Sequence, residues 1–287
     1  MLVLTGATGR LGSQVLDHVL RRVPAHSVGI SVRDPAKAAD LAARGVRVRA
    51  GDFTDPAGLQ HAFEGADRVL VISAAIRGPG AVEANLAAVD AALAAGASRI
   101  LYTSHQAASP DSLFAPQRTH AATEEHLLAL GIPFTALRHG FYASTLRFSV
   151  GDALRTGRLV APADGPVSWT AHADLAEAAA TALTQDGVLD GVTPPLTAAE
   201  ALDLESVAGV LGELTGRTIT RVVVPDDEWA AAAVDGGMPA AAAEFTLGMY
   251  RASRRGEFDV TDPTLGALLG RRPTSARTEL EAIVAQP

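Results

Sequence analysis

Three glycines near the start of the chain have the spacing of a phosphate-binding loop. Residues 5–12 read TGATGRLG, directly after an apolar run and at the start of a segment with helical periodicity. Gly6 would allow a tight turn, Gly9 would let the backbone approach a pyrophosphate, and Gly12 would let the helix pack closely on the strand. The free N–H groups at the start of that helix would face the anion, so we interpret the motif as a dinucleotide site rather than an ordinary glycine-rich turn. The residues assigned to this site are Gly6, Thr8, Gly9, Arg10, Leu11 and Gly12.

The end of the second predicted strand indicates which dinucleotide binds. The strand ends in Arg33, whose planar guanidinium suits a ribose 2′-phosphate, and Lys37 adds a second positive charge one helical turn later. Asp34 could instead accept a hydrogen bond from a free ribose 2′-hydroxyl, and both cations could simply be solvated. We favour NADP(H) over NAD(H) as the cofactor.

Residues at the carboxyl ends of other strands complete the predicted cofactor site. Asp52 could accept a bond from the adenine amino group and Phe53 could line the adenine face, although both could equally form a plain turn. Small residues follow the fourth and fifth strands, where they would admit the ribose and nicotinamide or simply allow tight loop packing. These residues are Ser73, Ala74, Ala75, Thr103 and Ser104.

The inventory of side chains excludes the most common mechanism for this kind of site. The glycine loop resembles that of the short-chain dehydrogenase/reductase superfamily, whose usual catalytic pair is Tyr-x-x-x-Lys. The single lysine of the chain is Lys37, and none of Tyr102, Tyr142 and Tyr250 is followed four residues later by lysine. A tyrosine acid activated by a lysine is therefore not available.

The chain as a whole resembles the atypical NmrA-like branch of that superfamily, and within it the NAD(P)H:quinone oxidoreductase type 2 group. The segments that carry the resemblance are VRDPAKA at 32–38, GDF at 51–53, ISAA at 72–75, LYTS at 101–104, HAATE at 120–124, LRHGFY at 137–142 and LGRRPTS at 269–275. The resemblance implies an NADPH-binding lobe, a small C-terminal lobe and a cleft in which a quinone or similar electrophile accepts hydride. NmrA-like proteins also include regulators that bind NADP(H) without turnover, so a redox sensor is the alternative.

The same resemblance points to catalytic residues on the helix after the fifth strand. His120 stands near the start of that helix, where related reductases of plant phenolic ethers carry a lysine and where the quinone-reductase-like members carry histidine. Glu124, which we also assign to the cofactor site, would share a helix face with His120 and could orient the imidazole or raise its pKa. His120 would then donate a proton or hold the nicotinamide amide, unless the two residues form only a surface pair.

The segment LRHGFY is expected to line the substrate cleft. Gly140 would allow a close approach of the nicotinamide or substrate, and Phe141 and Tyr142 would offer flat faces to an aromatic ligand, unless this pair belongs to the core. His139 stands where members of the group often carry asparagine. We assign Tyr142 to catalysis together with His120, and we assign His139, Gly140 and Phe141 to the substrate.

A quinone acceptor is compatible with so few catalytic groups. Hydride transfer depends chiefly on holding the nicotinamide against an electrophilic atom, and the cofactor performs the redox chemistry. The product is a delocalised hydroquinone anion, which is far less basic than the alkoxide formed from a ketone. The missing tyrosine–lysine pair therefore favours a quinone over an ordinary ketone as substrate.

Repeated βαβ units are expected to position these residues. Up to Arg138, short β-branched runs alternate with Ala/Leu-rich segments of helical spacing, a pattern typical of an α/β protein with a doubly wound parallel sheet, the Rossmann fold. The predicted strands are Leu2–Thr5, Ser27–Val32, Val46–Ala50, Arg68–Ser73, Arg99–Thr103 and Phe134–Arg138. The predicted helices are Gly9–Arg22, Pro35–Ala43, Pro56–Phe63, Gly80–Ala95 and Thr119–Leu130.

The remainder of the chain is expected to form a smaller, α-rich lobe. We predict a dinucleotide-binding domain over 1–140, segments of 141–190 that dock back onto it, and a substrate-cleft lobe over 191–287. Asp174 is expected to cap the helix that starts beside it. The other predicted elements are helices at Ser144–Arg155, Ala173–Thr184 and Leu204–Leu214, strands at Arg158–Ala161, near Val192 and at Thr218–Val224, two helices or a mobile flap within Ala230–Ala243, and further Ala-rich helices in the rest of the chain.

Composition excludes several classes of partner. The chain carries 24 Lys and Arg against 32 Asp and Glu, a net charge of −8, which argues against nucleic acid and anionic lipid. It has no cysteine and no apolar stretch near the ~20 residues that span a bilayer, so we expect a soluble, cytoplasmic protein. The histidines lack metal-binding spacing, so no metal site is predicted. The expected partner is a small-molecule substrate, and a homodimer is left open.

Overall fold

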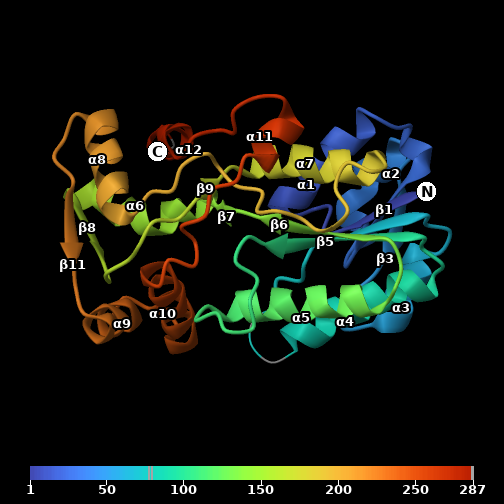
Figure 1. Cartoon of the computed structure of the whole chain (residues 1–287), viewed down its shortest axis with the longest axis horizontal. Coiled ribbons are helices and arrows are strands. Elements are labelled where there is room, and N and C mark those ends of the chain that lie inside the picture. The colour runs from blue at the N-terminus through green and yellow to red at the C-terminus, as the bar shows by residue number, and fades with distance from the viewer. Residues whose placement is uncertain (77, 79, 286–287) are drawn as a thin grey trace.

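The computed structural model describes residues 1–76, 78 and 80–285, and its centre is a seven-stranded parallel sheet (Figure 1). The strand order β10-β6-β5-β4-β1-β2-β3 places β1 at the point where the winding direction reverses. This is the order of a doubly wound Rossmann sheet, so the predicted fold class is confirmed. The strands are β1 (Leu2–Thr5), β2 (Val28–Val32), β3 (Arg47–Ala50), β4 (Arg68–Val71), β5 (Arg99–His105), β6 (Phe134–His139) and β10 (Gly191–Val192).

Helices cover both faces of this sheet (Figure 1). Helices α1 and α7 pack against each other on one face, and α3, α4 and α5 pack in a row on the other. The buried face of α1 follows helical spacing, with Leu11, Val15 and Val19 in the core. None of the described helices is long and apolar enough to cross a membrane. The bounds are α1 (Arg10–Leu20), α2 (Ala39–Ala43), α3 (Pro56–Phe63), α4 (Ala81–Ala94), α5 (Ala115–Ala129) and α7 (His172–Thr184).

Helix α5 begins earlier than predicted, at Ala115 rather than Thr119. Pro116 lies in its first turn, where proline is tolerated because the first N–H groups of a helix have no intrahelical partner. The prediction that His120 stands near the helix start is therefore wrong. His120 lies more than one turn into α5, so the regular helical backbone sets the direction of its side chain.

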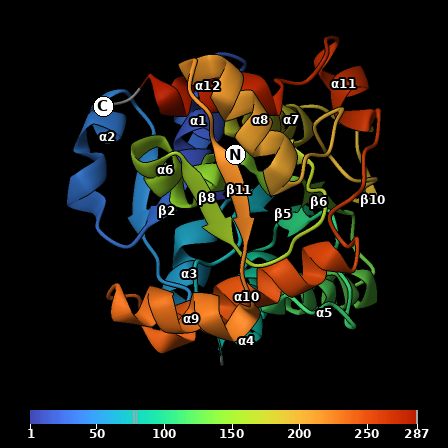
Figure 2. The same cartoon turned by 90° about the vertical axis from the view of Figure 1, so that its left-hand side faces the viewer.

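A second apolar core lies beyond the carboxyl ends of the central strands (Figures 1 and 2). Two small parallel sheets, β8–β11 and β7–β9, pack there with helices from the C-terminal part of the chain. Every element predicted after residue 140 is present, and the Ala-rich run forms two helices. The domain boundaries themselves stay a prediction. The bounds are β7 (Phe141–Tyr142), α6 (Leu146–Thr156), β8 (Arg158–Ala161), β9 (Trp169–Thr170), α8 (Leu204–Thr215), β11 (Thr220–Val223), α9 (Asp226–Asp235), α10 (Ala240–Arg254), α11 (Thr264–Leu269) and α12 (Ala276–Val284).

The strand expected near Val192 belongs to the central sheet rather than to the smaller lobe. Strand β10 pairs in parallel with β6, with Gly191 opposite Thr135. Pro194 and Pro195 follow it directly, and proline cannot donate to a strand ladder, so the strand ends after two residues. The predicted start of the C-terminal lobe at residue 191 therefore falls inside the sheet.

Asp174 joins α7 to the C-terminal segment instead of capping its own helix. Its buried carboxylate accepts hydrogen bonds from Arg271 Nη1 at 2.7 Å and from the backbone N–H of Thr274 at 2.6 Å. The residue at the N-cap of α7 is Ala171, and no side chain among the described residues caps that helix. The capping prediction is wrong because Asp174 lies within the first turn, facing the segment that follows α11.

We expect Asp174→Ala to lower the free energy of unfolding by about 2–4 kcal/mol. The change removes the buried half of an ion pair and leaves the N–H of Thr274 without its partner. Urea unfolding at neutral pH measures the difference. Glu177→Gln, at the more exposed partner of Arg271, is the control and should cost less than about 1 kcal/mol. Equal losses for the two variants would contradict the stabilising role of Asp174.

Candidate active site

The loop between β1 and α1 has a conformation that requires glycine at two positions. Gly6 adopts a φ of +62°, in the left-handed region, and the carbonyl oxygen of Gly6 accepts a hydrogen bond from the N–H of Gly9 at 2.9 Å. A Cβ on Gly12 would lie 2.1 Å from that same oxygen, so α1 could not approach β1 as closely with any other residue. Within the described chain no side chain caps α1, which leaves its first N–H groups free for an anion.

The other residues predicted in this loop differ in what they offer. Thr8 and Arg10 are exposed, whereas the side chain of Leu11 is buried in the core, so only the Leu11 backbone could contact a ligand. Arg10 lies near His172 at the start of α7. Burial, with a smaller contribution from the charge of Arg10, lowers the pKa of His172 to about 4. Arg10 is therefore a cation at the mouth of the glycine loop.

The cationic residues after β2 are free to meet a ligand, and the competing carboxylate is engaged. Arg33 and Lys37 are both exposed. Asp34 caps the short helix Pro35–Ala38, and its Oδ1 accepts from the N–H of Ala36 at 3.1 Å. Because that carboxylate has a backbone partner, the geometry favours Arg33 over Asp34 as the residue that meets the ribose.

Asp52 and Phe53, after β3, form a structured turn. Asp52 Oδ1 accepts from both the N–H and the hydroxyl of Thr54, at 2.8 and 2.7 Å. These bonds, followed by the charge of Arg33, hold the pKa of Asp52 below its usual value against a small opposing effect of burial. Phe53 is partly buried against the core below α3. Both features fit the plain-turn alternative, and a contact with adenine stays a prediction.

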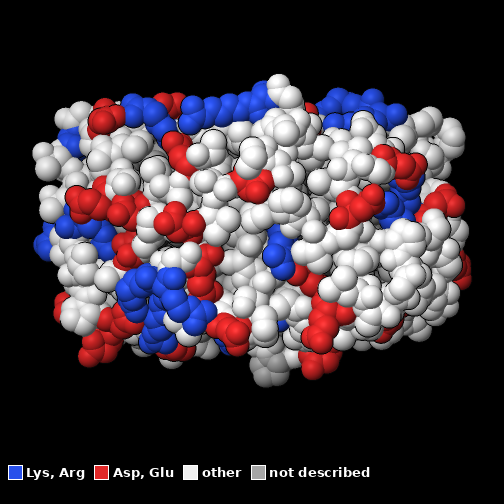
Figure 3. Space-filling view, in the orientation of Figure 1, with Lys and Arg blue, Asp and Glu red and all other residues white. Residues whose placement is uncertain are grey.

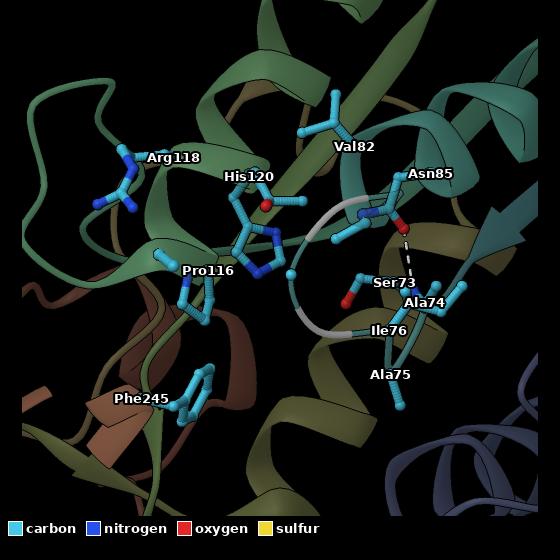
Figure 4. Close-up of a pocket in the computed structure, with 14 residues that line it drawn as sticks. Ser73, Ala74, Ala75, Ile76, Val82, Asn85, Pro116, Arg118, His120 and Phe245 are labelled. Carbon is cyan, nitrogen blue, oxygen red and sulfur yellow. Dashed lines mark hydrogen bonds between the residues drawn. The ribbon is translucent and has the colours of Figure 1, made fainter. Parts of the chain in front are cut away.

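A cavity of about 530 Å³ lies where β4 and β5 end beside α4 and α5 (Figure 4). Its wall is mostly small and apolar, and the imidazole of His120 projects into it between Pro116 and the segment that follows β4. A pocket of this volume and character suits a flat organic molecule. The lining residues are Ser73, Ala74, Ala75, Ile76, Gly78, Ala81, Val82, Asn85, Ala115, Pro116, Arg118, Thr119, His120 and Phe245.

The hydrogen-bond partner of His120 is Tyr102, not Glu124. The phenol oxygen of Tyr102 lies 2.8 Å from Nδ1 of His120. Burial lowers the pKa of His120 to about 4, so the imidazole is neutral at pH 7. The expectation that a carboxylate would orient this ring and raise its pKa is wrong in both respects.

Glu124 is engaged on another side of α5. Its carboxylate accepts two hydrogen bonds from Arg138, at 2.9 and 2.6 Å, and one from the hydroxyl of Ser104 at 2.6 Å. The carboxylate and the hydroxyl are both buried. Glu124 and Arg138 border a separate cavity of about 380 Å³. The polar atoms of Ser104 and Glu124, both predicted to bind the cofactor, thus have protein partners, and neither residue lines the larger cavity.

The small residues after β4 are held in place by two buried polar side chains. Thr103 accepts from the N–H of Ser73 at 2.8 Å, and Asn85 Oδ1 accepts from the N–H of Ala74 at 2.9 Å (Figure 4). Ser73, Ala74 and Ala75 line the cavity as a consequence, whereas Thr103 supports them from behind. Their predicted contact with ribose and nicotinamide stays a prediction, with Thr103 acting through Ser73.

Gly140 and Phe141 have structural reasons for their residue types. A Cβ on Gly140 would lie 2.1 Å from Oγ1 of Thr170, so protein rather than ligand fills the space beside this glycine. Phe141 is buried, with its ring centroid 5.3 Å from that of Trp169 and 5.1 Å from that of Phe258. Of the two alternatives for Phe141, the core position is the one observed. The reason proposed for Gly140, a close approach of the ligand, is wrong.

His139 and Tyr142 lie next to a second histidine at the start of α7. Neither ring nitrogen of His139 has a hydrogen-bond partner among the described residues, although the side chain is buried. Burial, with smaller contributions from His172 and His120, lowers the pKa of His139 to about 3. Tyr142 packs on His172 with ring centroids 4.2 Å apart, and burial raises its pKa to about 12. Unsatisfied buried nitrogens mark the place where a ligand or water would bind.

Sequence reasoning missed several residues that build the cavity. Asn85 is polar within an otherwise apolar helix face, and Tyr102 places a hydroxyl inside an apolar strand, so both gave a signal. Phe245 comes from α10, far along the chain, and its sequence surroundings predict only a helix. The missed residues are Asn85, Tyr102, Pro116, Arg118 and Phe245.

The reversal of strand order at β1 and the glycine loop that follows it define a protein of the Rossmann class. The profile of the NmrA-like family matches residues 1–279, so the chain belongs to the NmrA-like family. The resemblance inferred from the sequence is thereby confirmed. On the face shown in Figure 3, groups of basic side chains lie beside groups of acidic ones.

Several relatives are reductases. The chain is 35% identical to quinone oxidoreductase 2 of Escherichia coli strain K12, over 97% of this chain and 96% of that one. It is 30% identical to the NAD(P)H azoreductase of Xenophilus azovorans, over 87% and 86%. The crystal structure of the E. coli NADPH-dependent quinone oxidoreductase with NADPH superposes with a TM-score of 0.92, at 31% identity over 99% of both chains. The Citrobacter sp. triphenylmethane reductase with NADP(H) also has a TM-score of 0.92, at 32% identity over 99% and 100%.

The buried histidines should make the stability of the protein depend on pH. In an unfolded chain histidine titrates near pH 6.5, whereas the pKa values of His120, His139 and His172 are lowered to about 4, 3 and 4. As the pH falls below about 6.5, the unfolded chain takes up protons that the folded protein does not. The free energy of unfolding should therefore fall, by up to about 1.4 kcal/mol per pH unit for each histidine.

His139→Asn should make this pH dependence shallower by about one proton. Urea unfolding at a series of pH values between about 7.5 and 4.5 gives the slope. His26→Asn, at an exposed position, is the matched control and should leave the slope as it is. A His139→Asn slope identical to that of the unmodified protein would show that the burial of His139 does not oppose its protonation.

Proposed function

We propose that this protein is an NADPH-dependent oxidoreductase that transfers hydride to a quinone or a similar electrophilic small molecule. The observation that carries the proposal is the adjacency of two features. The glycine loop follows β1, and the apolar cavity with His120 opens at the end of β4, the strand that pairs with β1. The relatives, among them quinone, azo and triphenylmethane reductases, support the same reaction class. The cytoplasmic location and the homodimer stay predictions.

The residues present fit NADP(H). The free N–H groups of α1 suit the pyrophosphate, and exposed Arg33 and Lys37 suit the 2′-phosphate. The nitrogens of His139, buried and without a partner among the described residues, suit a group that can hydrogen-bond to them. When bound, the nicotinamide would supply the hydride and its electron pair.

The residues of the chain would orient the acceptor and keep water away from it. Most of the cavity wall is apolar, which disfavours ordered water beside the acceptor, and His120 is the residue of that wall whose ring nitrogen can meet an acceptor oxygen. Because the pKa of His120 is lowered to about 4, His120 donates a hydrogen bond as neutral imidazole rather than as imidazolium. A quinone that takes up one hydride and one proton becomes a hydroquinone, and water can supply the proton because the intermediate anion is weakly basic.

We expect the purified protein to oxidise NADPH when benzoquinone or menadione is added, and Gly9→Val to abolish this activity. A Cβ on Gly9 would lie 3.2 Å from the Gly6 oxygen, which is a tight contact, and the valine side chain would stand where the backbone is expected to approach the pyrophosphate. The loss of reduced-nicotinamide absorbance measures turnover, and calorimetry measures binding. Gly209→Ala, at an open helical position, is the control. If calorimetry shows that NADPH binds but neither benzoquinone nor menadione is reduced, the enzyme hypothesis is rejected and the redox-sensor hypothesis is favoured.

We expect Arg33→Ala to raise the dissociation constant for NADPH about tenfold or more and to leave that for NADH nearly unchanged. The 2′-phosphate loses a charged hydrogen-bond donor, whereas NADH carries only an uncharged hydroxyl at that position. Titration of the two reduced cofactors by fluorescence gives both constants. Arg44→Ala, an exposed arginine beyond α2, controls for the loss of one positive charge. Parallel weakening of both cofactors would contradict the role of Arg33.

A further inference from the structure

We propose that Tyr102 is a positioning residue that fixes which ring nitrogen of His120 carries the hydrogen. The consequence is a site that accelerates the reduction of acceptors on which negative charge develops at an oxygen or nitrogen atom. The kinetic part of this proposal rests on the reductase function proposed above. The position of the hydrogen is a property of the protein alone and is measured separately.

The geometry joins Tyr102 to one specific nitrogen of His120. Tyr102 is fully buried on β5, and its phenol oxygen lies 2.8 Å from Nδ1 of the imidazole. The ring of His105 also stacks on that of His120, with ring centroids 6.1 Å apart and an interplanar angle of 27°. Two neighbours therefore contact the imidazole, and Nε2 is the nitrogen that faces the cavity (Figure 4).

The direction of this hydrogen bond follows from the surroundings of the phenol. Burial raises the pKa of Tyr102 above its usual value, so the phenol keeps its hydrogen, and a buried O–H requires an acceptor. His120 Nδ1 lies 2.8 Å from it, and an imidazole nitrogen is a stronger hydrogen-bond acceptor than a hydroxyl oxygen. Thr123 also has a side-chain hydrogen bond to the phenol, and because its own hydroxyl donates to the carbonyl of Thr119 at 2.9 Å, Thr123 is the competing acceptor.

Tyr102 therefore donates to Nδ1, and the hydrogen of the neutral imidazole lies on Nε2. An N–H group aimed into an apolar cavity stabilises negative charge that develops next to it. A quinone gains such charge on its oxygen when hydride adds, and an azo compound gains it on the second nitrogen. A triphenylmethane cation accepts hydride at carbon and becomes neutral without building negative charge on a neighbouring atom. Reduction of the first two acceptors should depend on Tyr102, and reduction of the cation should not.

The first test measures the hydrogen position directly. Long-range ¹H–¹⁵N correlation spectra of the ¹⁵N-histidine-labelled protein, with the His120 signals assigned by their loss in His120→Gln, show which nitrogen is protonated. We expect the Nε2–H form in the unmodified protein and in Thr123→Val, and a mixture of both forms in Tyr102→Phe. An Nδ1–H form in the unmodified protein would overturn the proposal, because the histidine would then be the donor. A change from that form to Nε2–H in Thr123→Val would show that Thr123 accepts the phenol hydrogen instead.

The second test measures the consequence for reduction. Tyr102→Phe keeps the ring and should lower kcat for menadione about tenfold, with the KM for NADPH unchanged. The rate with a triphenylmethane cation should stay within about twofold of that of the unmodified protein. Tyr250→Phe, which removes the same atom from a buried tyrosine of the second core, controls for lost packing and should change neither rate. Unchanged menadione turnover in Tyr102→Phe, or an equal loss with the cation, would overturn the proposed selectivity. If the unmodified protein reduces no acceptor, the reductase function fails, while the spectra still decide the position of the hydrogen.

Discussion

The site depends on one backbone contact, the approach of the first turn of α1 to the carbonyl group of Gly6. That approach is possible only because Gly12 has no Cβ, and it sets how deeply α1 lies against the sheet. The depth in turn buries the apolar face of α1 and brings α7 alongside it. It also leaves the uncapped N-terminus of α1 at the edge of the sheet where β4 and β5 end. Packing of the core and availability of an anion site are thus two results of the same contact.

Helix α5 separates two kinds of buried polar chemistry. On one side, Glu124 is matched by Arg138 and Ser104, so its charge is neutralised and each of its oxygens has a partner. Such a network stabilises the packing of α5 against the sheet and leaves few hydrogen-bonding atoms available for a ligand. On the other side, His120 is neutral and presents a nitrogen to an apolar cavity. A helix that carries both can keep its position while the cavity side changes its hydrogen bonds.

The sequence was sufficient for the features that depend on local patterns. The strands and helices of the sheet, the glycine loop and the family follow from periodicity, glycine spacing and short motifs, and the structure and the family match confirm them. The start of α5 was misplaced by four residues, although Pro116 in its first turn is the same signal that begins the predicted helices at Pro35 and Pro56. The placement of the cofactor and catalytic residues around a bound ligand stays a prediction.

Partnerships across the fold could not be predicted in the same way. Glu124 has the correct spacing to meet His120 on a helix. Its carboxylate instead pairs with the guanidinium of Arg138 on β6, because Arg138 donates two hydrogen bonds to it. Asp174 lies in a sequence context typical of a helix cap. Its carboxylate instead binds Arg271, which lies 97 residues later in the chain. Tertiary packing decides which side chains pair in this way, and a single sequence does not reveal tertiary packing.

The short strand β10 has a consequence for how the protein is synthesised. It completes the sheet beside β6, yet it leaves the ribosome only after the whole of α6, β8 and α7. Until then the outer edge of β6 carries unpaired N–H and C=O groups, the kind of edge on which nascent chains associate. When β10 arrives it is two residues long and is followed by Pro194 and Pro195, so this edge of the finished sheet offers little for another strand to pair with. Between the synthesis of β6 and that of β10, the unpaired edge of β6 is therefore open to association with other nascent chains.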